Sequence, residues 1–204
     1  MGYVVVILAA YLMGTSNMAL YLSVLKRCDI RDSGSGNLGA SNTTLILGWR
    51  AGVLVGAHDI GKSALAVILA QLIFPDLPYI GALAGAASVL GHIYPFYLKF
   101  KGGKGFASFI GAALVLNFNI TLVVLALMAA VTWFTDFIVL GTFTTVTLVP
   151  LGIWLVTGSV VEPLILLAVG IVILLHHREN FVRIVKGKEI GLKSAIKGEH
   201  KKVS

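Results

Sequence analysis

The sequence predicts an all-α integral membrane protein, a bundle of seven transmembrane helices with its N-terminus outside and its C-terminus in the cytoplasm. Apolar residue types make up 57% of its 204 residues and charged types only 12%, whereas an ordinary soluble domain has about 25% charged residues. Uncharged stretches long enough to cross ~30 Å of hydrocarbon recur along the chain. A soluble fold of this size could not bury so much apolar surface, which excludes a soluble enzyme and a disordered protein.

The spans follow from the uncharged segments. Residues 2–25 carry no charge. A secretory signal peptide begins with basic residues, but no Lys or Arg precedes this segment, so we expect a retained helix. Residues 106–135 are long for one helix and short for two. The predicted spans are residues 2–25, 51–74, 79–98, two helices within 106–135, 137–157 and 160–175.

The positive-inside rule decides how often residues 106–135 cross the membrane. Lys and Arg cluster at 26–50, at 99–104 and in the tail that follows His176. Two crossings, with a turn at 117–119, place all three clusters in the cytoplasm, whereas one crossing would leave the tail outside. With two crossings, the outer turns carry no Lys or Arg; these are residues 75–78, 117–119 and 158–161.

One transmembrane domain, residues 1–204, accounts for this pattern. The tail from about residue 186 is too polar for a span, so we expect a surface helix or a frayed end on anionic lipid. The net charge of +7 favours anionic partners such as membrane lipids, and we expect no nucleic acid. The single cysteine, Cys28, cannot form an internal disulfide.

The first of three unusual polar segments spans residues 33–42. Its glycines, set among small hydroxyl and amide residues, would let backbone N–H groups converge on an anion, and a helix is expected soon after. A flexible Gly/Ser linker is the alternative, although it does not account for the two asparagines. The candidate phosphate-binding residues are Ser35, Gly36, Asn37, Ser41 and Asn42.

The second segment, residues 99–105, reads Lys-Phe-Lys-Gly-Gly-Lys-Gly. Its glycines would allow a phosphate close to the backbone, its lysines supply charge, and it opens a helix whose N-terminus favours anions. An ordinary basic loop would explain the lysines but not the glycine spacing. The candidate site residues are Lys101, Gly102, Gly103 and Lys104. His92, near the end of a span, is more typical of a packed histidine.

The third segment begins at His176 and ends at Glu189. At helical spacing His177 and Asn180 share a face, so they could address one site together. For the basic residues of this segment a juxtamembrane helix is the better explanation; these are Arg183, Lys186 and Lys188.

Residues 56–63 match the phosphate-loop pattern G-x-x-x-x-G-K-[ST], but that loop needs a preceding strand, and here the pattern lies inside a predicted span. Asp59 and Lys62, three apart on one helix face, are better explained as an intramembrane ion pair that supports the site. No His or carboxylate pairs have convincing ligand spacing, so no metal is expected.

These segments together resemble the PlsY-type bacterial glycerol-3-phosphate acyltransferases, which use acyl phosphate as donor, and the resemblance covers nearly the whole chain. The family's first motif, G-S-G-N-x-G-A-T-N, matches residues 34–42 with Ser41 for threonine. Its second, H-x-x-P-x-F-x-x-F-K-G-G-K-G, matches His92, Pro95 and residues 101–105. Its third, H-R-x-N-I-x-R-x-x-x-G-x-E, matches residues 177–189 with Phe181 for isoleucine.

Two further positions bear on the resemblance. The family's Asp-x-x-Lys pair looks like Asp59 and Lys62, with Ser63 where glycine is usual. Leu45 stands where the family commonly has an arginine, for which Arg50 is a candidate replacement.

The resemblance implies transfer of a long-chain acyl group from acyl phosphate to the 1-hydroxyl of glycerol 3-phosphate. The products would be lysophosphatidic acid and phosphate, at the cytoplasmic side of the inner membrane, in the first step of bacterial phospholipid synthesis and without a cofactor. The implied catalytic residues are His177, Asn180 and Lys104, with structural support from Asp59, Lys62 and Glu189.

Acyl phosphate is already activated, so no acyl-enzyme is required. His177 and the phosphate of glycerol 3-phosphate are both candidates for the base; our hypothesis is that the phosphate is the base and that His177 and Asn180 position it. The His-x-x-x-x-Asp pattern of acyl-CoA-dependent acyltransferases is absent from the sequence. A small anion transporter with a basic vestibule is the alternative function.

Overall fold

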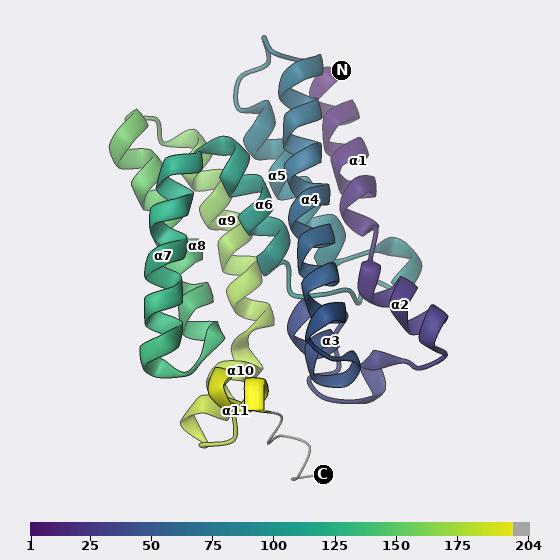
Figure 1. The fold of residues 1–204 in the computed structure, drawn as a ribbon. Helices are drawn as coiled ribbons and strands as arrows, with labels where there is room; N and C mark the ends of the chain where they lie inside the picture. Colours follow the sequence, from purple (N-terminus) through teal and green to yellow (C-terminus); the bar gives the residue numbers. More distant parts are fainter. Residues whose placement is uncertain (198–204) are drawn as a thin grey trace. The chain divides into compact units, whose positions relative to one another are not determined.

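The structure is a computed structural model that describes residues 1–197, and all regular secondary structure in these residues is helical (Figure 1). The predicted surface tail extends beyond residue 197 and lies in part outside the described residues. The helices are α1 (Gly2–Thr15), α2 (Met18–Lys26), α3 (Ala40–Leu47), α4 (Trp49–Ile73), α5 (Ile80–Ile93), α6 (Phe106–Leu116), α7 (Phe118–Thr135), α8 (Ile138–Thr157), α9 (Val161–His176), α10 (Arg178–Val185) and α11 (Leu192–Lys197), with 3₁₀ turns η1 (Ile30–Asp32) and η2 (Phe96–Leu98).

The chain forms two compact units, Met1–Phe118 (unit 1) and Asn119–Ser204 (unit 2). In unit 1, α1 packs on α5, α4 packs on α5 and α6, and α2 and α3 lie against α4 (Figure 1). Glycines permit the closest crossings. A Cβ on Gly14 of α1 would overlap the carbonyl of Ser88 in α5, and one on Gly111 of α6 would overlap that of Ile60 in α4.

In unit 2, α8 packs against α9. Gly141 and Gly152 of α8 lie next to side chains of α7, those of Met128 and Ile120 respectively. The helix α10 follows α9 after a bend of 50°, and His177 occupies the bend. Unit 2 is therefore a set of closely packed apolar helices that ends in a short polar helix.

The first predicted span is broken. α1 ends at Thr15 and α2 begins at Met18, with Asn17 as the N-cap of α2: its Oδ1 accepts a hydrogen bond from Leu20 N at 2.9 Å. Residues 2–26 are long and apolar enough for one span, but the expected single helix over residues 2–25 is interrupted here. An asparagine cap stabilises a new helix start, and the freed carbonyls of α1 find partners elsewhere.

The predicted interruption near residue 117 is confirmed, since α6 ends at Leu116, Asn117 is extended and α7 begins at Phe118; a reversal of the chain at this point stays a prediction. Within the described residues, four segments are long and apolar enough to cross a membrane, and the bent pair of α9 and α10 would be a fifth. The helices α5 and α6, with 14 and 11 residues, are shorter than the ~20 that a full span needs. The number seven and the orientation stay predictions.

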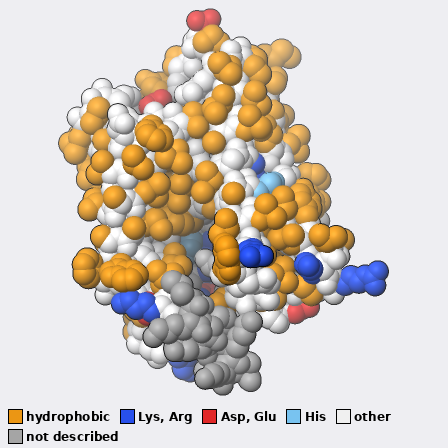
Figure 2. Space-filling view, viewed as in Figure 1, with side chains coloured by type: hydrophobic (Ala, Val, Ile, Leu, Met, Phe, Trp, Pro, Cys, Tyr) orange, Lys and Arg blue, Asp and Glu red, His pale blue; other side chains and the backbone are white. Residues whose placement is uncertain are grey.

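Hydrophobic side chains cover most of the surface visible in Figure 2 along the helices, and Lys and Arg gather at the end of unit 1 where α2 and α3 lie. Such a surface matches hydrocarbon along the helices and water or lipid headgroups at their ends. Exposed large apolar side chains include Leu8, Val53 and Leu72 in unit 1 and Val123, Leu155 and Leu164 in unit 2.

Candidate functional site

The motif-one loop, residues 33–42, is organised around the side chain of Asn42, which is 0% exposed. Its Oδ1 accepts a hydrogen bond from Ser35 N at 2.7 Å, and its Nδ2 donates to the carbonyl oxygens of Ile30 and Asn37 at 2.7 and 3.0 Å. These partners belong to the backbone of the loop and its entry, so Asn42 shapes the loop. Direct contact of this side chain with phosphate stays a prediction that the geometry does not favour.

Two tight turns bring the rest of this loop to the surface. Gly34 and Gly36 have φ of +64° and +67°, a conformation that glycine adopts readily. Asn37 Nδ2 donates to Ser35 Oγ at 2.7 Å. Ser35 and Asn37 are half-buried, whereas Gly36 and Ser41 are exposed. The loop therefore offers hydroxyl, amide and backbone groups to a molecule that approaches from outside.

The entry to the motif-one loop is fixed by a short ion pair. The Asp29 carboxylate accepts hydrogen bonds from Arg31 N at 2.9 Å and from Arg31 Nη2 at 2.6 Å. The hydrogen bond from the Arg31 side chain, followed by that from its backbone, lowers the pKa of Asp29 from 3.8 to about 2. Asp29 thereby stays ionised and caps η1 at any physiological pH.

The motif-two loop, residues 99–105, folds back on the end of α5. Gly102 N donates to Ile93 O at 2.9 Å, and Gly103 N donates to His92 O at 3.2 Å. A Cβ at Gly103 would overlap His92 Nε2 and would lie 2.9 Å from Leu38 O in the motif-one loop. These two glycines therefore permit close packing between the two loops. Phosphate contact through their amides stays a prediction, which these existing hydrogen bonds do not favour.

The approach of Gly103 to Leu38 brings two helix starts close together. Gly39 is the N-cap of α3 and Gly105 is the N-cap of α6, and neither start has a side-chain cap. Backbone N–H groups at a helix start point outward and carry partial positive charge, so they attract anions. Of the two predicted lysines, Lys101 is exposed and Lys104 is half-buried. This end of unit 1 is suited to bind phosphate groups.

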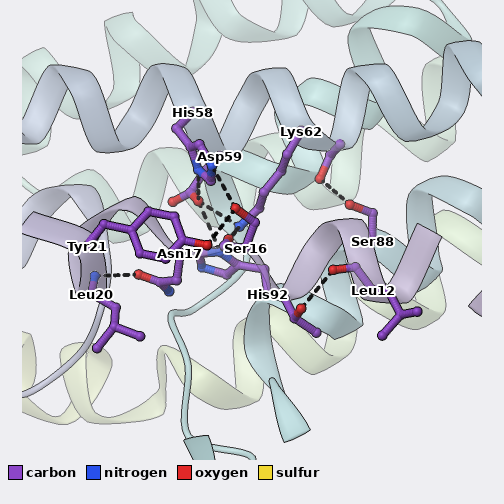
Figure 3. A network of polar contacts seen from close by, with 12 residues as sticks. Leu12, Ser16, Asn17, Leu20, Tyr21, His58, Asp59, Lys62, Ser88 and His92 are labelled. Atoms are coloured by element: carbon purple, nitrogen blue, oxygen red, sulfur yellow. Dashed lines mark hydrogen bonds and ion pairs between the residues drawn. The ribbon is translucent and has the colours of Figure 1, made fainter. Parts of the chain in front are cut away.

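A buried polar network lies beneath the two loops (Figure 3). The ammonium group of Lys62 donates to Asp59 Oδ1 at 2.8 Å and to Ser16 O at 2.7 Å, and it lies 2.8 Å from His92 Nδ1. The predicted ion pair between Asp59 and Lys62 is thus confirmed. Lys62 joins three elements: the break between α1 and α2, its own helix α4, and α5.

The same network holds the His92 ring. Nδ1 lies 2.8 Å from the Lys62 ammonium nitrogen and 3.3 Å from Asp59 Oδ1, and Nε2 is the ring atom next to Gly103. His92 is 3% exposed. It is therefore a packed, hydrogen-bonded residue, as the sequence indicated, and it connects the network to the motif-two loop.

The residues at the break between α1 and α2 also make hydrogen bonds at this end of unit 1. Tyr97 in η2 donates to Thr15 O at 2.5 Å, beside the bond from Lys62 to Ser16 O. Ser16 Oγ lies 3.0 Å from His58 Nε2 and 3.2 Å from the hydroxyl of Tyr21 (Figure 3). The backbone carbonyls of Thr15 and Ser16, at the end of α1, are thus hydrogen-bonded by the side chains of Tyr97 in η2 and Lys62 in α4.

In unit 2, the motif-three segment, residues 177–189, is closed by Glu189. Its Oε1 accepts from Asn180 Nδ2 and its Oε2 accepts from Arg183 Nε, both at 2.6 Å. The reversal of the chain after α10 uses Gly187 at φ +65°. Glu189 therefore fixes both the Asn180 amide and the Arg183 guanidinium.

His177 is 8% exposed at the bend between α9 and α10. Its Nδ1 lies 2.8 Å from the carbonyl oxygen of Ile173. Because a carbonyl only accepts, Nδ1 donates, and in the neutral ring Nε2 carries the lone pair. The neutral ring therefore presents Nε2 as its hydrogen-bond acceptor.

Each unit thus gathers its own part of the predicted site. Unit 1 brings the two glycine-bearing loops into contact, and unit 2 brings Asn180 and Glu189 together next to His177. Arg50, the candidate replacement for an arginine at position 45, is exposed in the first turn of α4, where its guanidinium lies 5.5 Å from the Trp49 ring centroid.

Sequence reasoning did not identify Ser16 and His58 as participants of the buried network, nor Asn17 as the helix cap beside it. A sequence signal existed only for Asn17, an amide in an otherwise apolar span and a good helix N-cap. Ser16 and His58 contact each other but lie 42 residues apart in sequence, and no local pattern links them. No group of three His, Cys, Asp or Glu side chains able to hold a metal occurs within residues 1–197.

Comparison with known proteins gives consistent matches. The model of the family described as glycerol-3-phosphate acyltransferase matches residues 4–187. The glycerol-3-phosphate acyltransferase of Syntrophotalea carbinolica is 34% identical over 191 residues, which cover 92% of this chain and 96% of the relative. That of Thermoanaerobacter pseudethanolicus is 37% identical over 195 residues, with coverage of 92% and 96%.

Two solved structures are also similar. The crystal structure of PlsY, an integral membrane glycerol 3-phosphate acyltransferase, in its glycerol 3-phosphate form has a TM-score of 0.87 and 31% identity, over 94% of this chain and 96% of that one. Its lysophosphatidic acid form has a TM-score of 0.86 and 29% identity, over 96% and 99% of the two chains.

Proposed function

The chain belongs to the glycerol-3-phosphate acyltransferase family, and we propose that it transfers a long-chain acyl group from acyl phosphate to the 1-hydroxyl of glycerol 3-phosphate. The products are lysophosphatidic acid and inorganic phosphate. The observation that carries the proposal is the contact between the motif-one and motif-two loops, which brings together two helix starts that lack side-chain caps. Two adjacent anion-binding positions suit a reaction between two phosphorylated substrates.

The reaction needs no acyl-enzyme. The glycerol 1-hydroxyl oxygen attacks the acyl carbon, the C–O bond to the donor's phosphate breaks, and phosphate leaves with the bonding electrons. The hydroxyl proton passes to the phosphate of glycerol 3-phosphate, whose second pKa is about 6. The Asn180 amide donates to that phosphate, and Nε2 of neutral His177 accepts a hydrogen bond from the P–OH group that forms. The chain's contribution is then positioning and electrostatic stabilisation, without a cofactor.

Residues of unit 1 have distinct roles in this proposal. Lys104 and Lys101, which precede α6, supply positive charge for phosphate and for the oxyanion that develops on the acyl carbonyl oxygen. The exposed part of the motif-one loop supplies further donors, from Ser35, Gly36, Asn37 and Ser41. Asn42, Gly102 and Gly103 act mainly by shaping the two loops that present these groups.

The proposed location is the cell's inner membrane, with seven spans and the site facing the cytoplasm. Contact between the motif-one and motif-two loops supports one part of this arrangement: the two loops lie on the same side of the membrane, so α4 and α5 between them cross an even number of times. A long-chain substrate also explains why the reaction is carried out by an apolar helix bundle: the acyl chain stays in lipid while its phosphate reaches the basic end.

The direct test is an assay of the purified full chain in detergent. Glycerol 3-phosphate and palmitoyl phosphate, with EDTA and without thioester, are expected to yield lysophosphatidic acid and phosphate in equal amounts. Palmitoyl-CoA in place of palmitoyl phosphate is expected to yield neither. Activity with palmitoyl-CoA alone would refute the proposed donor, and a protein that only moved phosphate across proteoliposomes would be the anion transporter instead.

A further inference from the structure

Asp136 lies in the turn between α7 and α8 and has φ of +70°, a left-handed conformation that is unfavourable for most residues and best tolerated by glycine, Asn and Asp. Its Oδ1 accepts a hydrogen bond from Lys193 N at 2.8 Å, and its carbonyl oxygen accepts one from Leu192 N at 2.7 Å. Asp136 therefore binds the start of α11, which lies 57 residues further along the chain.

Two other contacts fix the same segment. Gly191 packs so closely that a Cβ there would overlap the Asp136 carboxylate. The ammonium nitrogen of Lys193 lies 5.5 Å from the ring centroid of Trp133, in the last turn of α7, a favourable cation–π distance. Residues 191–193 are thus held by the end of α7 and the turn that follows it.

This anchored segment begins two residues after Glu189. The Glu189 carboxylate binds Asn180 and Arg183, and its side chain is only 13% exposed. The residues on its other side, Lys186 to Lys188, are exposed. Their backbone amides donate to carbonyls of α10, so the backbone at Glu189 is held by α10 on one side and by the Asp136 contacts on the other.

We propose that Asp136 is a positioning residue: by holding residues 191–193, it fixes the Glu189 carboxylate, which orients the Asn180 amide toward glycerol 3-phosphate. The inference rests on the proposed function, because it takes Asn180 to contact that substrate. Asp136 itself touches no substrate. Its effect reaches the site through Gly191 and Glu189 alone.

The test compares three variants of the full chain. Asp136→Gly keeps the left-handed backbone but removes the carboxylate. Gly191→Ala disturbs the same contact from the other side. Asp136→Asn keeps both an acceptor oxygen and tolerance of the backbone conformation.

For Asp136→Gly and Gly191→Ala the KM for glycerol 3-phosphate is expected to rise about fivefold, the effect of one lost hydrogen bond, with the KM for palmitoyl phosphate unchanged. Asp136→Asn and the control Asp76→Gly, in the exposed α4–α5 turn, are expected to match wild type.

A purely structural role would lower the amount of active enzyme and leave both KM values unchanged. In a Glu189→Gln background, Gly191→Ala is expected to raise the KM for glycerol 3-phosphate no further, since its effect passes through Glu189. An unchanged KM in Asp136→Gly and Gly191→Ala, or full additivity with Glu189→Gln, would overturn the proposal.

Hydrogen–deuterium exchange separates this inference from the proposed function. Faster exchange of amides 180–189 in Asp136→Gly than in Asp76→Gly is expected, and unchanged exchange would overturn the anchoring itself. Faster exchange together with an unaltered KM in an Asn180→Ala variant would instead show that the anchoring exists but that Asn180 does not serve glycerol 3-phosphate. That second result would overturn both the positioning claim and this part of the proposed function.

Discussion

The loops of unit 1 and the motif-three segment of unit 2 are held in place by different means. In unit 1 the side chains that hold the loops are buried: Asn42, Asp59 and His92 are 0%, 2% and 3% exposed. In unit 2 the bonds are made by Glu189 and Arg183, whose side chains are 13% and 33% exposed. Water competes for the second set but not for the first, so a lost bond in unit 1 leaves an unsatisfied buried group.

Because of this difference in burial, substitutions in the two parts of the site should have different effects. In unit 1, changes at the buried network should lower stability, and changes at the loop glycines should displace the loops. In unit 2, changes should alter the position of substrate-binding groups while the helices remain folded. Four predictions test this difference, from the largest expected effect to the smallest.

Lys62→Met is expected to destabilise the protein most. It removes the donor shared by Asp59, Ser16 O and His92 and leaves a buried carboxylate without its cation, at a cost of about 3 kcal/mol or more. Thermal unfolding in detergent is the measurement. Because removal of both charges leaves no buried ion, Asp59→Asn combined with Lys62→Met should be less destabilised than Lys62→Met alone. A double variant as unstable as the single one would contradict this account of the network.

Gly103→Ala is expected to reduce kcat/KM by about 100-fold, since displacement of catalytic groups by about 1 Å can cost that much. The added Cβ would overlap the His92 ring, which Lys62 holds from the other side, and would lie 2.9 Å from Leu38 O. The matched control is Gly61→Ala in α4, where an added Cβ meets nothing within 4 Å and alanine favours the helix. Equal activity of the two variants would show that close packing of the loops is not needed.

Glu189→Gln is expected to lower kcat/KM for glycerol 3-phosphate about fivefold to tenfold, with a thermal midpoint close to wild type. Asn180 and Arg183 donate to different oxygens of the carboxylate, and in glutamine an NH2 group replaces one of these oxygens, so that it faces a donor instead of accepting from it. Glu179→Gln is the control. The Glu179 side chain is 74% exposed, and its carboxylate lies 4.0 Å from the same arginine, so this ion pair contributes little. A large loss of stability in Glu189→Gln would remove the contrast between the two units.

Much of the fold could be predicted from the sequence because hydrophobic length and charge placement act locally. The helix break at Asn117 and the Asp59–Lys62 ion pair both follow from such local patterns. At the break near Ser16 the sequence offered only Asn17 as a local signal, because the partners of the freed carbonyls, Lys62 and Tyr97, come from distant elements. The packing role of Gly103 likewise depends on a contact with Leu38, which only the folded chain brings near.

The candidate site shows the same limit. Residue types and spacing pointed to phosphate binding by both glycine-bearing loops, but they did not distinguish a residue that faces a ligand from one that shapes the loop. Asn42 illustrates this: an amide in a Gly/Ser-rich segment suggests a ligand contact, whereas the structure uses both of its polar atoms within the loop. That distinction depends on burial and on hydrogen-bond partners, which sequence spacing does not give.

The smallest effect is expected at the entry to the motif-one loop, where Asp29 and Arg31 form an exposed pair. The pKa of Asp29 is lowered from 3.8 to about 2 by its hydrogen bonds to Arg31. The folded state therefore favours the carboxylate, so the contribution of Asp29 to stability is fully present above about pH 4 and is lost as the pH falls toward 2. The difference in thermal midpoint between wild type and Asp29→Asn should be small at pH 6, because exposed pairs contribute little, and should shrink toward zero near pH 2. A difference that grew on acidification would mean that Arg31 stabilises this turn without the Asp29 carboxylate.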